Sequence, residues 1–193
     1  MQWMTRAATT LAMAGLVAVS GLNTHAQSNA PKEAFDAIAI VNNNLGSGAG
    51  TVQMRISRWS SDAERDRLTN ALTQKGPDAL LKELIKTKPV GIIKTPDSLG
   101  YDLHYAYQQP GEDGGRQIVI ATDRPIGFWE ARNQPRSFDY PFTVIQMQID
   151  RNGEGTGTLS YATKIRVVKD TIELENFATS PVMLTKITAK KST

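Results

Sequence analysis

The sequence predicts an α+β fold: a mostly antiparallel β sandwich or barrel of about eight or nine strands with an inserted αα hairpin. Most of the chain consists of short segments in which apolar and polar residues alternate, as they do in half-buried strands. Turn sequences rich in Gly, Asn, Asp and Pro separate these segments, and such short connections join antiparallel neighbours. Helical periodicity is found in one region, about residues 61–88.

The N-terminal segment 1–26 has the features of a cleaved, Sec-type signal peptide. Arg6 precedes an apolar run of small residues, and Thr24 and Ala26 occupy the −3 and −1 positions of a cleavage site. The uncharged run is too short for a comfortable membrane span, which needs about 20 apolar residues. We therefore expect a periplasmic or secreted protein with no stable membrane anchor after cleavage behind Ala26.

Cleavage would leave a polar leader at residues 27–33 and a single α+β domain at residues 34–193. The full chain contains no cysteine and carries a formal net charge of +3. An exported protein without disulfides depends on its hydrophobic core for stability. No clustered basic residues mark a nucleic-acid surface, so we expect no nucleic-acid partner.

The first two strands are predicted at residues 34–41 and 51–59. In the second strand Val52, Met54 and Ile56 share one face, which indicates that this strand is half-buried. The segment between the strands is rich in Asn and Gly, which tolerate positive φ, and it therefore predicts a long hairpin loop.

The helical pair begins with a capping box, in which Ser61 is the N-cap and Glu64 stands three residues later. Gly76 is expected to end the first helix and Pro77 to begin the second, which follows the usual preferences of these residues. The second helix carries an apolar stripe of leucines and Ile85 that should pack on a sheet.

Every segment after Val90 has the composition of a strand or a turn. Residues 101–109 alternate as in one continuous strand, with three tyrosines and Leu103 on one face and with Asp102 and His104 on the other. Asn152 and the glycine that follows it are a strong signal for a hairpin turn.

His104 is the one histidine that follows the predicted cleavage site, so the choice of catalytic base is narrow. If the hairpin that follows it pairs Gln109 with Arg116, Asp123 lies opposite Asp102 on the face that carries His104. Asp102, His104 and Asp123 could then bind a divalent metal ion or form an Asp-oriented general base. The alternative is a solvated face with a hydrogen-bonded histidine. The sequence favours that alternative, so we expect no metal and no cofactor.

Aromatic and arginine side chains supply a candidate ligand site. Tyr101, Tyr105 and Tyr107 either line a ligand cleft or form the buried face of a strand. The segment 123–141 is longer than a usual hairpin connection, and long loops are often functional. Its arginines could bind an anion, or they could pair with the acidic residues of the same segment. The candidate ligand residues in this segment are Trp129, Arg132, Arg136 and Phe138.

The segments 91–109, 123–142 and 150–159 resemble an uncharacterised group of small exported bacterial proteins. The resemblance covers most of the chain beyond the signal peptide. It implies export, and it implies no particular activity.

Three functions remain open. The first is an exported, non-catalytic protein that binds a small apolar or anionic ligand or an envelope partner. The second is a metal-assisted hydrolase that uses Asp102, His104 and Asp123. The third is a structural or assembly protein that associates through exposed strand edges. The sequence leaves open whether the protein is an enzyme, but the lack of a complete catalytic set favours a non-catalytic role.

Overall fold

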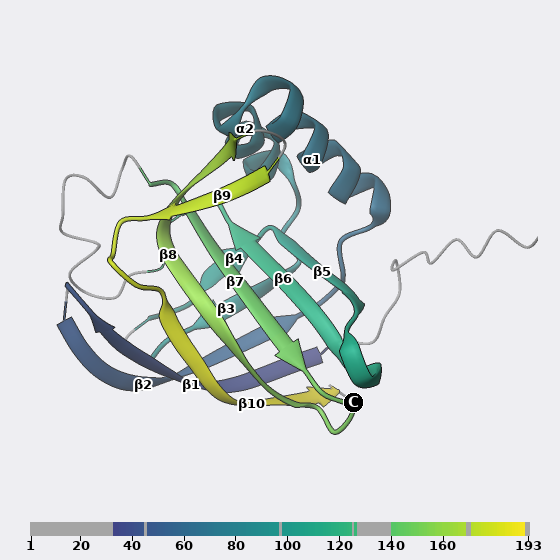
Figure 1. The fold of residues 1–193 in the computed structure, drawn as a ribbon. Coiled ribbons are helices and arrows are strands. Elements are labelled where there is room, and N and C mark those ends of the chain that lie inside the picture. The colour runs from purple at the N-terminus through teal and green to yellow at the C-terminus, as the bar shows by residue number, and fades with distance from the viewer. Residues whose placement is uncertain are drawn as a thin grey trace, which may run out of the picture.

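The computed structural model describes residues 33–44, 46–96, 98–124, 126, 140–168 and 171–191. Antiparallel strands form a nearly closed barrel of nine strands, and two helices complete the predicted α+β fold (Figure 1). The strands are β1 (Glu33–Asn43), β2 (Gly46–Ile56), β3 (Gly91–Lys94), β4 (Tyr101–Leu103), β5 (Tyr105–Pro110), β6 (Arg116–Thr122), β7 (Phe142–Ile149), β8 (Glu154–Val168), β9 (Thr171–Asn176) and β10 (Val182–Lys191). The helices are α1 (Asp62–Lys75) and α2 (Pro77–Lys86).

The strand order β4-β3-β2-β1-β10-β8-β7-β6-β5 explains how the barrel closes. The N-terminal strand β1 lies between β2 and the C-terminal strand β10. It thereby joins the group β2 to β4 on one side to the group β5 to β8 and β10 on the other. The two ends of this order, β4 and β5, are consecutive in the chain, with His104 between them. The sheet therefore curls until its ends meet, so the fold is a barrel and not a sandwich.

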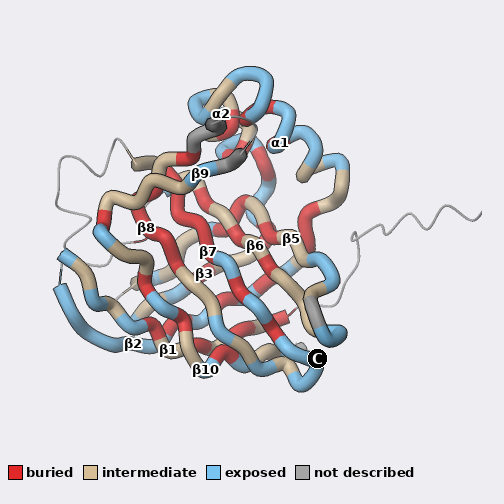
Figure 2. The backbone as a smooth tube through the Cα atoms, in the orientation of Figure 1, coloured by how far each residue is buried: buried red, intermediate tan, exposed pale blue. Residues whose placement is uncertain are grey.

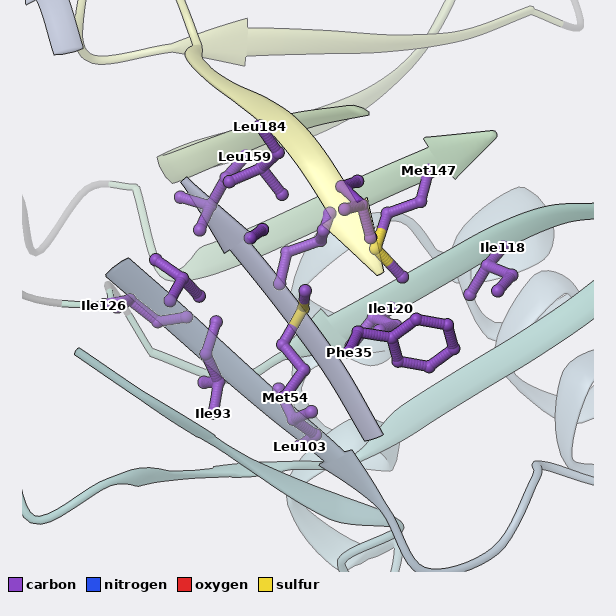
Figure 3. Close-up of a cluster of buried hydrophobic side chains, with 14 of the residues drawn as sticks. Phe35, Met54, Ile93, Leu103, Ile118, Ile120, Ile126, Met147, Leu159 and Leu184 are labelled. Carbon is purple, nitrogen blue, oxygen red and sulfur yellow. The ribbon is translucent and has the colours of Figure 1, made fainter. Parts of the chain in front are cut away.

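Side chains fill the interior of the barrel (Figure 3). The alternation predicted for β2 is confirmed, because Val52, Met54 and Ile56 are all buried. Figure 3 shows Phe35, Met54 and side chains from the strands opposite them pointing toward one another. The barrel interior is therefore the main hydrophobic core of the protein.

The two helices pack on the outside of the barrel, at the end where β7 begins (Figure 1). The capping box is confirmed: the Ser61 hydroxyl accepts a hydrogen bond from the Glu64 backbone N–H, and the Glu64 carboxylate accepts one from the Ser61 backbone N–H. Ile85 is 54% exposed, so the apolar stripe of α2 is narrower than predicted. The second apolar cluster consists of Leu68, Leu72, Leu80, Leu84, Phe142, Val144 and Ile165.

No described helix is long and apolar enough to cross a membrane.

Strand β8 leaves the barrel at a β-bulge. The register of β8 with β7 shifts between Phe142 and Val144, and Ala162 of β8 has a φ of 50°. A bulge of this kind bends the strand that carries it. Beyond the bulge β8 pairs with β9, and Ile165 contacts the cluster under the helices. One strand therefore contributes to both hydrophobic clusters.

The glycine-rich segment before Thr51 is strand, and the prediction of a long loop there was wrong. Asn43 pairs with Gly46, so the pairing with β1 extends over the whole glycine-rich segment from Gly46 to Gly50. Glycine has a low intrinsic preference for strands, but continuous pairing with β1 overrides this preference. Figure 2 shows that the β1–β2 hairpin changes from buried to exposed toward this turn.

The Glu64 cap makes the stability of the protein sensitive to acid. Burial alone would raise the pKa of Glu64, but hydrogen bonds from Arg58 and Ser61 outweigh it and hold the pKa below its usual 4.5. A carboxyl with a lowered pKa stabilises the fold above the unfolded-state pKa, and this stabilisation is lost as the pH falls through the folded-state value.

We therefore expect Glu64→Gln to lower the free energy of unfolding by about 1 kcal/mol near neutral pH. The difference should be smaller in urea unfolding at a pH well below 4.5, because the stabilisation by the charged carboxylate is lost as the pH falls through its lowered folded-state pKa. An equal difference at both pH values would contradict this role of the Glu64 charge.

Candidate functional site

His104 separates β4 from β5, so the prediction of one continuous strand over residues 101–109 was wrong. Leu103, His104 and Ala106 are all buried, which shows that the alternation of faces shifts at the histidine. Its backbone N–H donates to the carbonyl of Ala121 in β6, at 3.1 Å. β4 pairs with β3 and β5 pairs with β6, and His104 therefore occupies the seam of the barrel.

The His104 imidazole connects three segments of the chain. Nδ1 lies 2.7 Å from the carbonyl oxygen of Thr87, and because a carbonyl only accepts, Nδ1 must carry the hydrogen. Nε2 lies 3.5 Å from Oδ1 of Asp123, and the two side chains are 11% and 13% exposed. The histidine thus joins the end of α2 to the end of β6 across the seam.

The predicted three-residue metal cluster does not form. Asp102 is exposed, whereas His104 is buried, so the two side chains do not share a face. The hairpin pairs Gln109 with Gln117, one residue away from the predicted partner Arg116. Among the described residues, no three His, Cys, Asp or Glu side chains lie close enough to hold a metal ion.

A His104–Asp123 pair remains, and both of its side chains are largely buried at the barrel seam. The Thr122 hydroxyl lies 3.2 Å from Oδ1 of Asp123, and Thr122 is fully buried. Its Oγ1 donates to the backbone carbonyl of Asp102 at 2.7 Å. The contacts with Thr87 and Thr122 give the pair a structural role at the seam.

The three predicted tyrosines lie on two different surfaces. Tyr101 packs against the barrel core from β4. Tyr105 and Tyr107 point outward from β5, because the shift at His104 turns them away from the core. The prediction that all three share a face was therefore wrong.

Tyr105 and Tyr107 hold α1 against the barrel. Their rings are stacked with centroids 6.3 Å apart, and the Arg65 guanidinium lies 5.0 Å from the centroid of the Tyr107 ring. The Tyr107 hydroxyl donates to Asp62 at 3.0 Å and accepts from Arg65 at 2.5 Å. Burial raises the pKa of Tyr105, so its hydroxyl stays neutral at physiological pH. These contacts give the two tyrosines a packing role between α1 and β5, and their role in ligand binding stays a prediction.

Four predicted ligand residues, Trp129, Arg132, Arg136 and Phe138, lie outside the described residues. Their role as a ligand loop stays a prediction. Of the flanking residues, Ile126 is buried in the barrel core and Tyr140 packs against its edge. The Phe177 ring packs edge-on against the Tyr140 ring, with the ring centroids 5.6 Å apart. The Lys164 ammonium lies 4.3 Å from the centroid of the Tyr140 ring.

A polar groove of about 740 Å³ lies where the β5–β6 turn, the β7–β8 turn and the middle of β10 come together. Ile149 and Ile187, which belong to the barrel core and are almost fully buried, lie at its base. Amide and hydroxyl side chains from four neighbouring strands complete its walls. These are Gln117, Gln148, Thr156 and Thr188.

Five charged residues also line the groove, and two of their charges are engaged locally. The Arg116 guanidinium forms a bidentate ion pair with the Glu33 carboxylate, with N–O distances of 2.7 and 3.0 Å. Hydrogen bonds from the backbone N–H groups of Glu154 and Asn152 lower the pKa of Asp150. The charged lining residues are Asp113, Arg116, Asp150, Glu154 and Lys186. Because both signs are present, the groove favours no single sign of ligand charge.

Sequence reasoning identified the two turns beside this groove but missed the groove itself. The Asn152 turn forms as predicted, with the Asp150 N–H donating to the carbonyl of Glu154. Nothing local in the sequence signals that β10 lies next to β8 and brings Lys186 to the same place.

No protein-family model, no curated protein and no solved structure matches this chain. The likeness to a group of small exported bacterial proteins therefore stays a prediction.

Proposed function

We propose that this chain is an exported, non-catalytic binding protein that holds a polar ligand in the groove between the β5–β6 turn, the β7–β8 turn and β10. One observation carries the proposal: the barrel interior is filled by its own side chains, whereas this polar hollow lies open at the surface. Its volume of about 740 Å³ falls within the range of small-molecule sites, roughly 300 to 1,000 Å³.

The chemistry of the groove supports a ligand that both donates and accepts hydrogen bonds. The Gln148 amide offers both kinds of group, and so do the hydroxyls of Thr156 and Thr188. The Gln117 amide offers its N–H donors, because its Oε1 already accepts from Gln109 at 2.9 Å. An apolar ligand has less support, because the apolar space that it needs is occupied by the core. Lys186 is exposed and, together with the carboxylates that line the groove, offers such a ligand charged partners of both signs.

Gln148→Ala is expected to weaken binding of the ligand that co-purifies from the protein's own envelope by about fivefold. The substitution removes hydrogen bonds worth about 1 kcal/mol. Native mass spectrometry would identify the co-purified species, and a titration with that species would measure its affinity.

Gln74→Ala is the matched control, because Gln74 is an exposed glutamine of α1 outside the groove. It should leave the affinity unchanged. Equal affinities for wild type and Gln148→Ala, or an envelope-purified protein that carries nothing, would contradict the proposal.

A further inference from the structure

One edge of β2 lacks a strand partner among the described residues. β2 pairs with β1 over its whole length, from Gly46 to Ile56, but β3 pairs only with Gln53–Ile56. Over residues 46–52 no other described strand lies against this edge. An unpaired edge presents backbone N–H and C=O groups that another strand can bind.

The sequence of this edge lacks two features by which proteins usually prevent edge pairing. Residues 46–52 contain no charged residue and no proline, although charges and proline are the common protection. A Cβ atom added at Gly48 or Gly50 would meet nothing within 4 Å, so no described side chain packs on the sheet at these two positions.

An exposed apolar row runs across the outer face beside this edge. Ala49 of β2 pairs with Ile40 of β1, and Ile40 pairs with Met183 of β10. Ile40 and Met183 are 41% and 48% exposed, which places them among the few large hydrophobic side chains of the described residues that face solvent. The edge and the row therefore occur at the same place on the molecule.

We propose that two copies of this chain associate by antiparallel pairing of their β2 edges, with Ala49 opposite Ala49 of the second copy. Directly paired residues point to the same face of a sheet. A two-fold axis perpendicular to the sheet makes each residue and its copy point to the same face. Because successive residues point to opposite faces, the symmetric pairing must place one residue directly opposite its own copy. Centring on Ala49 joins the two apolar rows of Ala49, Ile40 and Met183 end to end, whereas centring on Gly48 would offset them.

The chain allows a direct test of this register because it contains no cysteine. Ala49→Cys is expected to form a disulfide-linked dimer under mild oxidation, since directly paired Cα atoms lie about 4.5 to 5.5 Å apart. Thr51→Cys is the matched control on the same strand and face. Its two copies would lie four residues apart along the strand, or about 13 Å, which is too far for a disulfide.

Light scattering on the cysteine-free chain is the second measurement. It should show a dimer whose fraction rises with concentration, and Ala49→Lys should abolish it by placing two like charges opposite each other. Gln74→Cys on α1 controls for random collisions. Equal cross-linking at positions 49, 51 and 74 would overturn the proposal, and so would a wild-type chain that stays monomeric over its whole soluble range.

Discussion

Gly155→Ala is expected to lower the free energy of unfolding by about 3 kcal/mol, the upper end of the usual cost of overpacking. An ideal Cβ at Gly155 would lie 2.0 Å from the carbonyl oxygen of Gln148 and 2.9 Å from Cδ1 of Ile149. The carbonyl belongs to the backbone of β7, which cannot move without disturbing its pairing with β8. Gly155 also faces Ile187 of β10, so three strands approach closely at this position.

The matched control is Gly48→Ala, in which the new Cβ meets no atom within 4 Å. This substitution should change stability by less than about 0.5 kcal/mol or stabilise slightly, because alanine lowers the entropy of the unfolded chain. Urea unfolding of both variants measures the difference. If Gly155→Ala is no less stable than Gly48→Ala, the close packing of β8 on β7 at this position is wrong.

His104→Leu is expected to lower the free energy of unfolding by about 2 kcal/mol, the typical cost of leaving a buried polar group without its partner. Leucine would leave the Thr87 carbonyl without its donor and the Asp123 carboxylate without the imidazole. Both groups lie at the barrel seam, and Thr87 is 4% exposed. The loss should therefore open the contact between the end of α2 and the seam.

Asp102→Asn provides the control for His104. The Asp102 side chain is exposed, and Thr122 bonds only to its backbone carbonyl, so the variant should stay within about 0.5 kcal/mol of wild type. Hydrogen exchange of the Ala106 and Ala121 amides would show whether the seam has loosened. A His104→Leu protein as stable as wild type would contradict the structural role of the histidine.

Local sequence signals predicted the elements whose causes are local. The Ser61 capping box depends on atoms within three residues, and the turn at Asn152 depends on atoms within four. The alternation in β2 similarly identified Val52, Met54 and Ile56 as core residues. In each case the residues that determine the local structure lie close together in the sequence.

The wrong predictions concern positions whose structure is determined by contacts between residues far apart in the sequence. The alternation over residues 101–109 is unbroken in the sequence, but His104 bonds to Thr87 and Ala121, and these bonds divide the strand. The predicted cluster with Asp102 failed for the same reason, since the division turns the two side chains to different surroundings. The glycines from Gly46 onward became strand because β1 pairs with them.

The candidate groove could not be predicted because it combines residues far apart in the sequence. Gln117, Gln148 and Lys186 come from β6, β7 and β10. Gln117 and Gln148 are neighbours because β6 pairs with β7, and Lys186 lies near them because β10 pairs with β8. No spacing or motif in the sequence marks this set.

The most direct test of the central claim is an amide NMR titration of the wild-type protein with the ligand recovered from its envelope. Ligand binding in the groove should shift the signals of Gly111, Gly115 and Gly155, which line it. The signals of Gly48 and Gly50 should stay in place, because they lie near the β1–β2 turn and outside the groove. Shifts at Gly48 and Gly50 without shifts at the three groove glycines would contradict the account.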